Sequence, residues 1–306
     1  MIKYAFRRLV YSSLIVFVIL TIAFFILRVI PGDPVVSMMG LLTPKSVIEA
    51  TRVELGLDKP LPQQYVDYLK GILSGDLGES LRQRQPVFPL IMKSLLRTGQ
   101  LSLLAICFAV VMAFTLGILS ALYRGSYFDK LVLFILMVGQ SIPNFWLGTM
   151  LLLIISVRLR LLPALGYQGA VSLIMPAITL AVGLFPILAR YIRSNMSEIM
   201  VNDFIFSLRS RGVSETQIIF RHILKHISIP LITIISQQSG YLLAGAFIVE
   251  SVFNYPGVGF LGIVAASNRD FPLLQGIVVV VSTIFVIINL VIDLIYSAID
   301  PRIRYQ

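Results

Sequence analysis

Residues that could carry chemistry are few and widely spaced in this chain. A run from Gly257 to Gly262 matches the G-x-G-x-x-G pattern of dinucleotide-binding loops by letter. It follows an apolar stretch and the turn Asn254-Tyr255-Pro256, without the strand–turn–helix unit or the ribose-binding acid that such a loop needs. We therefore expect no dinucleotide site there. The sequence also holds no G-x-x-x-x-G-K-[ST] loop, so ATP and Mg²⁺, if used, should be bound by another polypeptide and no cofactor by this chain.

Metal chemistry is not expected either. The two histidines, His222 and His226, are four residues apart, a spacing that could hold a metal on one face of a helix. They stand beside Arg221 and Lys225, whose charges repel cations. The single cysteine, Cys107, lies in an apolar run and offers neither a disulfide nor a metal site.

Two acidic residues, Glu250 and Asp293, fall inside long apolar runs. An unpaired charge at the centre of a bilayer costs at least about 2.5–3.5 kcal/mol, so each should face protein or water. A proton relay is one interpretation; a structural pair or helix cap is the other, and we favour it. Gln237, Gln238 and Asn289 also have two interpretations. They either line a path through the membrane or form hydrogen bonds between helices.

Composition places these residues in a membrane. The chain has 306 residues, of which 57% are hydrophobic and 13% charged, with a mean hydropathy of +0.90. Such values predict a polytopic membrane protein in the lipid bilayer. The net charge is +10, but the basic residues lie mostly in loops between apolar runs, which favours retention on the cytoplasmic side over nucleic-acid binding.

Six apolar runs predict an all-α fold with six transmembrane helices. The first is long for a signal peptide and is taken as uncleaved. Short loops on its N-terminal side hold most of the Lys and Arg, which predicts cytoplasmic N- and C-termini. Prolines 143, 176 and 186 fall within the runs and are expected to kink them. The runs cover residues 9–27, 101–123, 130–157, 171–192, 231–253 and 272–299.

The long polar stretch between the first two runs predicts a small helical subdomain outside the membrane. Thr43 can cap a helix that Gly56 ends, and a second helix is expected over Pro62–Leu73. The predicted organisation is therefore a cytoplasmic N-terminus and first helix over 1–30, the external subdomain over 31–98, and a transmembrane core over 99–306.

One charged segment, 194–230, interrupts the second half of the chain and carries its own helix signals. A helix is expected over Phe204–Arg211, and Gly212 should end it in the left-handed region. Ser214 then opens a second helix, with Gln217 as its capping-box partner.

The second helix is amphipathic. Its apolar stripe, Ile218, Ile219, Ile223, Leu224 and Ile227, is expected to lie in the groove of a partner protein, and a helix lying on the lipid surface is the alternative. The residues of this segment expected to contact a partner are Arg209, Arg211, Gly212, Ser214, Glu215, Gln217 and Arg221.

Several motifs, in order along the chain, resemble one family. They are Pro31-Gly32-Asp33-Pro34, Leu55-Gly56-Leu57-Asp58-Lys59-Pro60, Gly75-Asp76-Leu77-Gly78-Glu79-Ser80-Leu81, Leu208-Arg209-Ser210-Arg211-Gly212, Glu250-Ser251-Val252-Phe253-Asn254-Tyr255-Pro256-Gly257 and Asp300-Pro301-Arg302. The chain is similar to permease subunits of ABC importers, in the dipeptide/oligopeptide/nickel branch. At Leu208 and Ser210 the family usually has alanine.

The resemblance implies a type I importer fold and a permease that is not itself an enzyme. It implies four kinds of partner: a homologous second permease, two ATPase subunits docked on 194–230, an extracytoplasmic substrate-binding protein, and the bilayer of a prokaryotic inner membrane. Peptides are the favoured substrates, followed by nickel or a nickel chelate, then glutathione or oligosaccharides. A stand-alone secondary transporter or channel is the alternative from another class, but the apolar runs supply almost no ionisable path for it.

Overall fold

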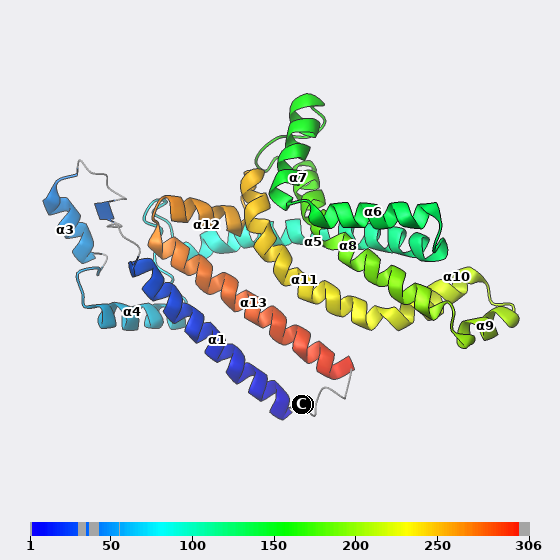
Figure 1. The fold of residues 1–306 in the computed structure, drawn as a ribbon. Coiled ribbons are helices and arrows are strands. Elements are labelled where there is room, and N and C mark those ends of the chain that lie inside the picture. Colours follow the sequence, from blue (N-terminus) through cyan, green and yellow to red (C-terminus); the bar gives the residue numbers. More distant parts are fainter. Residues whose placement is uncertain (1, 30–34, 37–42, 55, 300–306) are drawn as a thin grey trace. The chain divides into compact units, whose positions relative to one another are not determined.

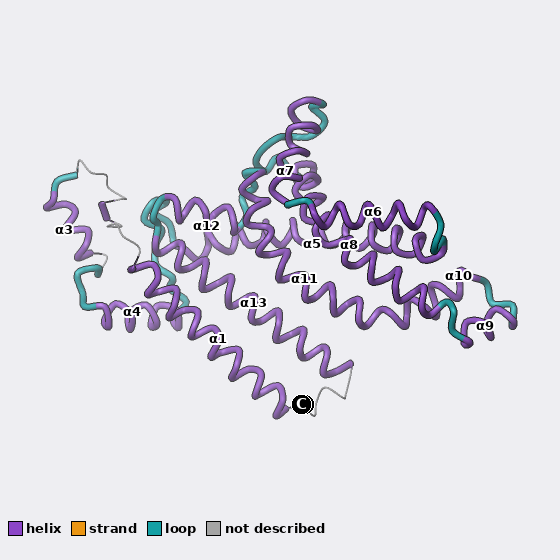
Figure 2. Tube along the Cα trace, viewed as in Figure 1, coloured by secondary structure: helices purple, strands orange, loops and turns teal. Residues whose placement is uncertain are grey.

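The computed structural model describes residues 2–29, 35–36, 43–54 and 56–299. Within these ranges the chain is helical, apart from loops and one isolated bridge between Glu79 and Pro86 (Figures 1 and 2). Backbone contacts divide it into two compact units, 1–95 with 261–306, and 96–260. This division differs from the predicted one because the last helix joins the N-terminal part. The motifs at 31–34 and 300–302 lie outside the described residues.

Four helical stretches are long and apolar enough to cross a membrane, and two bent helix pairs raise the number to six. The four contain α1 (Ile2–Val29), α5 (Val87–Leu122), α8 (Ile174–Ile199) and α13 (Phe271–Ile299). Five of the six predicted runs correspond to the four helices and the first bent pair. The second pair, Glu215–Ser228 with Pro230–Gln238, bends by 56° and overlaps only the start of the predicted run 231–253, most of which lies in the helix Leu224–Val252. α5 begins well before residue 101, because the polar residues around Lys93 and Arg97 continue the same helix.

The third predicted run is broken rather than kinked. α6 (Tyr127–Ser141) and α7 (Asn144–Leu151) meet at an angle of 101°. Pro143 has no N–H to donate and disfavours helical geometry at the residue before it, and Ile142 is extended with φ −78° and ψ 124°. A π-helical turn, η1 (Leu152–Arg158), follows α7.

The other two prolines do not break their helix. Pro176 lies in the first turn of α8, where N–H groups have no helical partner, so the expected kink is not needed there. A 3₁₀ turn, η2 (Ala170–Leu173), precedes it. Pro186 lies inside α8, which continues as one helix to Ile199.

The first unit is built on α1 and α13, which run side by side in opposite directions (Figure 1). The first turn of α1 and the last turn of α13 therefore lie at the same end of the pair. Two further helices, α3 (Lys45–Glu54) and α4 (Leu61–Ser74), match the two helices predicted between the first two apolar runs. The left-handed Gly56 and Gly75 follow them, with φ of +65° and +78°.

The second unit is organised around α8. It packs against α6, α7 and α11 (Leu224–Val252), and most of its surface is buried. Ala105, Ala109 and Ala113 present a fully buried face of small side chains on α5. Two short helices, α9 (Asp203–Ser210) and α10 (Glu215–Gln217), form a tip at one end of α8 (Figure 1).

Candidate functional site

The tip segment, residues 202–230, has the predicted helix ends. The Asn202 side chain accepts a hydrogen bond from the Phe204 N–H and starts α9. Gly212 ends it with φ +77°, and the Val213 N–H donates to the Leu208 carbonyl at 3.2 Å. The Gly212 position is left-handed and open, so a side chain there would be strained by the backbone rather than by a clash.

The second helix begins where the sequence predicts. Ser214 is extended, and its Oγ accepts the Gln217 N–H at 3.4 Å. The helix widens into a π-helical segment, η3 (Ile218–Ile223), and then continues into α11. The coupling segment is thus joined to a long apolar helix by helical backbone that bends by 56° between Ser228 and Pro230.

The apolar stripe of this helix is buried within the same chain. Ile218 and Ile223 are fully buried, and they pack with Ala121 of α5, Met196 of α8 and Ile205 of α9. The expectation that the stripe lies in a partner's groove is therefore wrong. The stripe fixes the tip to the helices of its own unit, and only the opposite face is available to a partner.

That exposed face combines charges and aromatic rings. Arg209 and Glu215 form a bidentate pair, with Nε–Oε1 at 2.6 Å and Nη2–Oε2 at 3.2 Å. Phe206 is 72% exposed and Phe220 63% exposed. The expected coupling residues are all exposed and all belong to this one segment: Arg209, Arg211, Gly212, Ser214, Glu215, Gln217 and Arg221.

A buried ion pair holds the base of the tip. Arg193 of α8 donates two hydrogen bonds to Asp129 of α6, at 2.6 and 2.7 Å. Ser120 of α5 donates to the same carboxylate at 2.5 Å, and the Gly125 N–H at 2.9 Å. Three helices are therefore joined at one fully hydrogen-bonded carboxylate, which is the arrangement that makes a buried charge tolerable.

Glu250 is bound by a second set of donors. Thr98 Oγ1 lies 2.5 Å from Oε1, while the N–H groups of Gly259 and Phe260 donate to Oε2 at 2.8 and 3.1 Å. Thr98 also accepts the Val258 N–H at 2.8 Å. The carboxylate therefore caps the first turn of α12 (Val258–Ser267), where the helix dipole favours an anion.

Close packing around this cap accounts for two glycines of the G-x-G-x-x-G run. A Cβ at Gly257 would overlap the Glu250 carboxylate, and one at Gly259 would overlap the backbone of Phe247. The glycine-rich run thus packs around the Glu250 carboxylate of the same chain. This geometry favours the structural role of Glu250 over a proton relay.

The remaining candidates do not gather into one site. Gln237 is exposed and Gln238 half-buried on α11, and Asn289 is exposed on α13, where it donates to the Phe285 carbonyl at 2.9 Å. Asp293 lies in α13, but its side chain is outside the described part. The ring of His222 packs edge-on against Phe204 at 5.8 Å.

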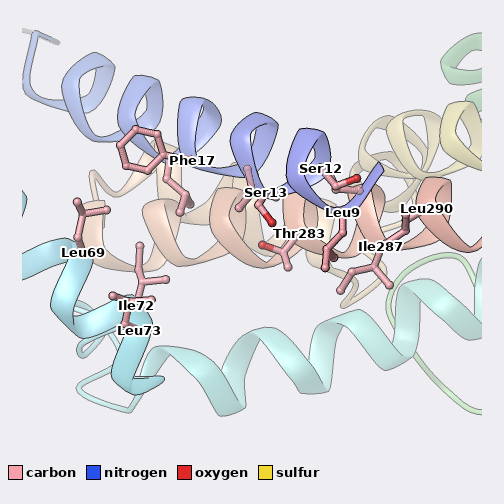
Figure 3. A pocket seen from close by; sticks show the side chains of 13 residues that line it. Leu9, Ser12, Ser13, Phe17, Leu69, Ile72, Leu73, Thr283, Ile287 and Leu290 are labelled. Atoms are coloured by element: carbon pink, nitrogen blue, oxygen red, sulfur yellow. The ribbon is translucent and has the colours of Figure 1, made fainter. Parts of the chain in front are cut away.

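The first unit holds an apolar groove of about 420 Å³ between α1, α4 and α13 (Figure 3). Leu9 and Phe17 come from α1, Leu69 and Leu73 from α4, and Ile287 from α13. The groove belongs to a face that membrane lipid or another apolar helix can cover, since its walls are almost entirely aliphatic and aromatic.

Sequence reasoning missed three residues of these clusters. Asp129 follows Ser126 by three residues before an apolar run, which is a capping-box pattern. Asp270 is buried, accepts from Ser80 at 2.5 Å, and precedes a helix with proline at its second position. Both patterns can be recognised in the sequence alone. Thr98 has no such signal, because its partners are about 150 residues away.

The described residues thus combine up to six apolar spans, long enough to cross a membrane, with an exposed charged tip. Residues 1–103 match the N-terminal family of binding-protein-dependent transport system membrane components, and residues 113–305 match the binding-protein-dependent transport system inner membrane component family. The chain belongs to this family. It is a permease of an ABC importer.

Relatives and solved structures agree with this assignment. The chain is 35% identical over 306 residues to the glutathione transport system permease protein GsiC of Pectobacterium atrosepticum and of Escherichia coli K12, covering each chain completely. Two inward-facing structures of the MetNI methionine ABC transporter share its fold. Their TM-scores are 0.58 and 0.56 at 18% and 21% identity, over 69% and 70% of this chain and 96% and 97% of theirs.

Proposed function

We propose that this permease forms the import path for short peptides together with a homologous second permease. Two ATPase subunits, which bind ATP and Mg²⁺, drive it from the cytoplasm, and a substrate-binding protein delivers the peptide outside. Glutathione is itself a tripeptide, so the full-length likeness to glutathione permeases supports the peptide class. In this scheme residues 31–98 face outward and both termini face the cytoplasm of a prokaryotic cell.

The observation that carries the proposal is the two-sided construction of the tip segment. Its apolar stripe is buried against α5 and α8, which fixes the exposed face to these helices. That face presents Phe206, Phe220 and the Arg209–Glu215 pair to solvent. Exposed aromatic side chains and arginine are residue types that protein-binding interfaces favour. A docked ATPase would therefore push directly on the spans.

Co-purification of the ATPase with tagged permease tests this docking face. Phe220→Ser should reduce the recovered ATPase at least about tenfold, because exposed aromatic anchors commonly contribute 2 kcal/mol or more to an interface. Phe88→Ser is the matched control, since Phe88 is also an exposed phenylalanine, 48% exposed, but lies at the start of α5 in the segment 31–98. Recovery equal to wild type for Phe220→Ser would contradict the proposal.

A charge swap distinguishes a role of the Arg209–Glu215 pair in ATPase docking from a role in stabilising the loop. Glu215→Arg breaks the pair with Arg209, and Arg209→Glu with Glu215→Arg restores it in reverse. If the pair only stabilises the loop, the double variant should recover ATPase binding. We expect it to remain deficient, because the partner would meet the wrong charge at both positions.

A further inference from the structure

A polar cavity of about 720 Å³ lies within the first unit, apart from the tip segment. The end of α1, the helices α3 and α4, the turn at 76–81 and the start of α13 enclose it. Its volume is in the range of small-molecule sites in proteins. Charged and amide side chains form part of its lining beside apolar residues such as Leu57, Ile72 and Val279, whereas the groove of Figure 3 is almost entirely aliphatic and aromatic.

Two buried polar groups on its wall have no protein partner in the part of the chain that the structure describes. They are the Tyr68 hydroxyl on α4 and the Gln275 amide nitrogen on α13. Folded proteins satisfy nearly all of their buried donors, because an unpaired one is destabilising. Two such groups on one cavity indicate that a polar ligand supplies the partners.

Positive charge on the cavity wall comes from Arg28, Arg52 and Lys59. Arg52 is paired with Glu49 at 3.4 Å and Lys59 with Asp67, so Arg28 is the cation of the three for which no ion pair is described among these residues. The Arg28 guanidinium is fixed in place: Nε donates to Gln64 at 3.1 Å, Nη1 donates to the Phe24 carbonyl at 3.2 Å, and the group lies 3.4 Å from the centre of the Phe24 ring. Burial lowers the pKa of Arg28 to about 10 and raises the pKa of Tyr68 to about 12. A carboxylate brought to Arg28 would offset this loss of hydration.

Negative charge on the wall comes from Asp76 and Asp67. Asp67 is paired with Lys59 at 2.8 Å, whereas Asp76 accepts the Gly78 N–H through Oδ1 at 2.9 Å. Asp76 is thus held in place at the end of α4 by a backbone donor. The cavity therefore offers a rigid guanidinium and a placed carboxylate, with unpaired neutral groups on the same wall.

We propose that this cavity binds a zwitterionic peptide of two or three residues, with its carboxylate at Arg28 and Arg52 and its ammonium group at Asp76. The Tyr68 hydroxyl and the Gln275 amide bind the peptide groups between these ends. The choice of a peptide rests on the proposed function. The site is additional to the path formed by the two permeases, and it would hold peptide on the outer side before entry.

Direct binding of trialanine tests the site. The assembled importer, with both permeases and the ATPases but without the binding protein, is placed in lipid nanodiscs and titrated with isotope-labelled trialanine. Wild type should bind, and trialanine amide, which lacks the carboxylate, should bind at least about tenfold more weakly. Equal binding of the two compounds, or no binding of trialanine, would overturn the proposal.

Two variants locate the bound peptide. Tyr68→Phe should weaken trialanine binding about fivefold, the usual effect of one lost hydrogen bond. Tyr65→Phe is the matched control, because its hydroxyl bonds to Thr21 at 2.7 Å and does not line the cavity. Gln275→Leu should also weaken binding. Unchanged affinity in both Tyr68→Phe and Gln275→Leu would contradict the site.

A second readout separates binding from folding. With no peptide present, Tyr68→Phe should not lower the melting temperature, because the hydroxyl has no partner to lose. A lower melting temperature would mean that a protein group satisfies it, and would overturn the proposal. Peptide uptake by wild type in whole cells, measured alongside, shows whether the importer itself works, so failure of this cavity and failure of the proposed function are distinguishable.

Discussion

At the scale of single residues, the Glu250 carboxylate replaces the ligand that a glycine-rich turn would otherwise receive. Backbone N–H groups at the start of α12 point at its Oε2, and Thr98 donates to Oε1. This is the same physics that binds phosphate at a helix N-terminus, directed at an internal anion. The sequence pattern alone could not show what filled the turn, because Glu250 and Thr98 meet only in the folded unit.

Glu250→Gln separates the structural role from a proton relay. The amide keeps the size of the side chain but offers one acceptor oxygen in place of two. We expect a loss of about 1–3 kcal/mol in the free energy of unfolding, because a buried N–H or hydroxyl loses its acceptor. Uptake per folded molecule should stay near wild type. Normal stability with abolished uptake would instead indicate a relay.

Gly259→Ala should destabilise the second unit by about 1–3 kcal/mol, since the added methyl group overlaps the Phe247 backbone. Gly99→Ala is the matched control. Gly99 lies in α5 with nothing within 4 Å of an added Cβ, so alanine there should be neutral or stabilise the helix. Melting temperatures of the purified proteins compare the two. Equal melting temperatures for the two variants would argue against the cap.

At the scale of elements, local signals predicted helix ends better than packing partners. Asn202, Gly212 and Ser214 act as the sequence indicates, because capping depends on neighbouring backbone groups. The prediction that the Ile218–Ile227 stripe packs against a partner protein was wrong. An amphipathic pattern shows that a face is covered but not whether the cover comes from the same chain. Likewise Pro143 predicted a disturbance of the helix, but the angle of 101° between the two halves depends on the surrounding helices.

Gly212→Val should abolish uptake while leaving membrane insertion intact. Valine at φ +77° strains the turn that sets the angle between α9 and the next helix, so the exposed face would be misplaced. Gly166→Val imposes the same strain at φ +77°, also with open space around it, but in the loop between η1 and η2. Its uptake should be closer to wild type. A normally expressed Gly212→Val protein with full uptake would contradict a coupling role.

At the scale of the whole molecule, the sequence predicted the class and the number of spans but not how segments group. Hydropathy predicts each span by itself, and the structure has four such helices, or up to six spans if each bent pair counts as one. The union of 1–95 with 261–306 depends on contacts between α1 and α13, which one sequence does not reveal. The polar cavity was equally hidden, because Tyr68 and Gln275 are about 200 residues apart.

Orientation in the membrane remains a prediction from the distribution of Lys and Arg. In a Cys107→Ser background, a cysteine at Ser74 should react with an impermeant maleimide in intact cells, and one at Ser214 should react only after the cells are opened. Both positions are exposed on the protein, so the difference reports the side of the membrane. The reverse labelling pattern would invert every loop assignment.

Cysteine cross-linking between the tip segment and the ATPase tests the central claim most directly. Single cysteines at positions 212–222, in the same Cys107→Ser background, are paired with cysteines across the ATPase surface and treated with a short bifunctional thiol reagent in membranes. Exposed positions such as Ser214, Glu215 and Gln217 should give a permease–ATPase product, and a cysteine at Ser74 should give none. The absence of any product along 212–222, in variants that still import peptide, would contradict the assignment of this segment as the coupling element.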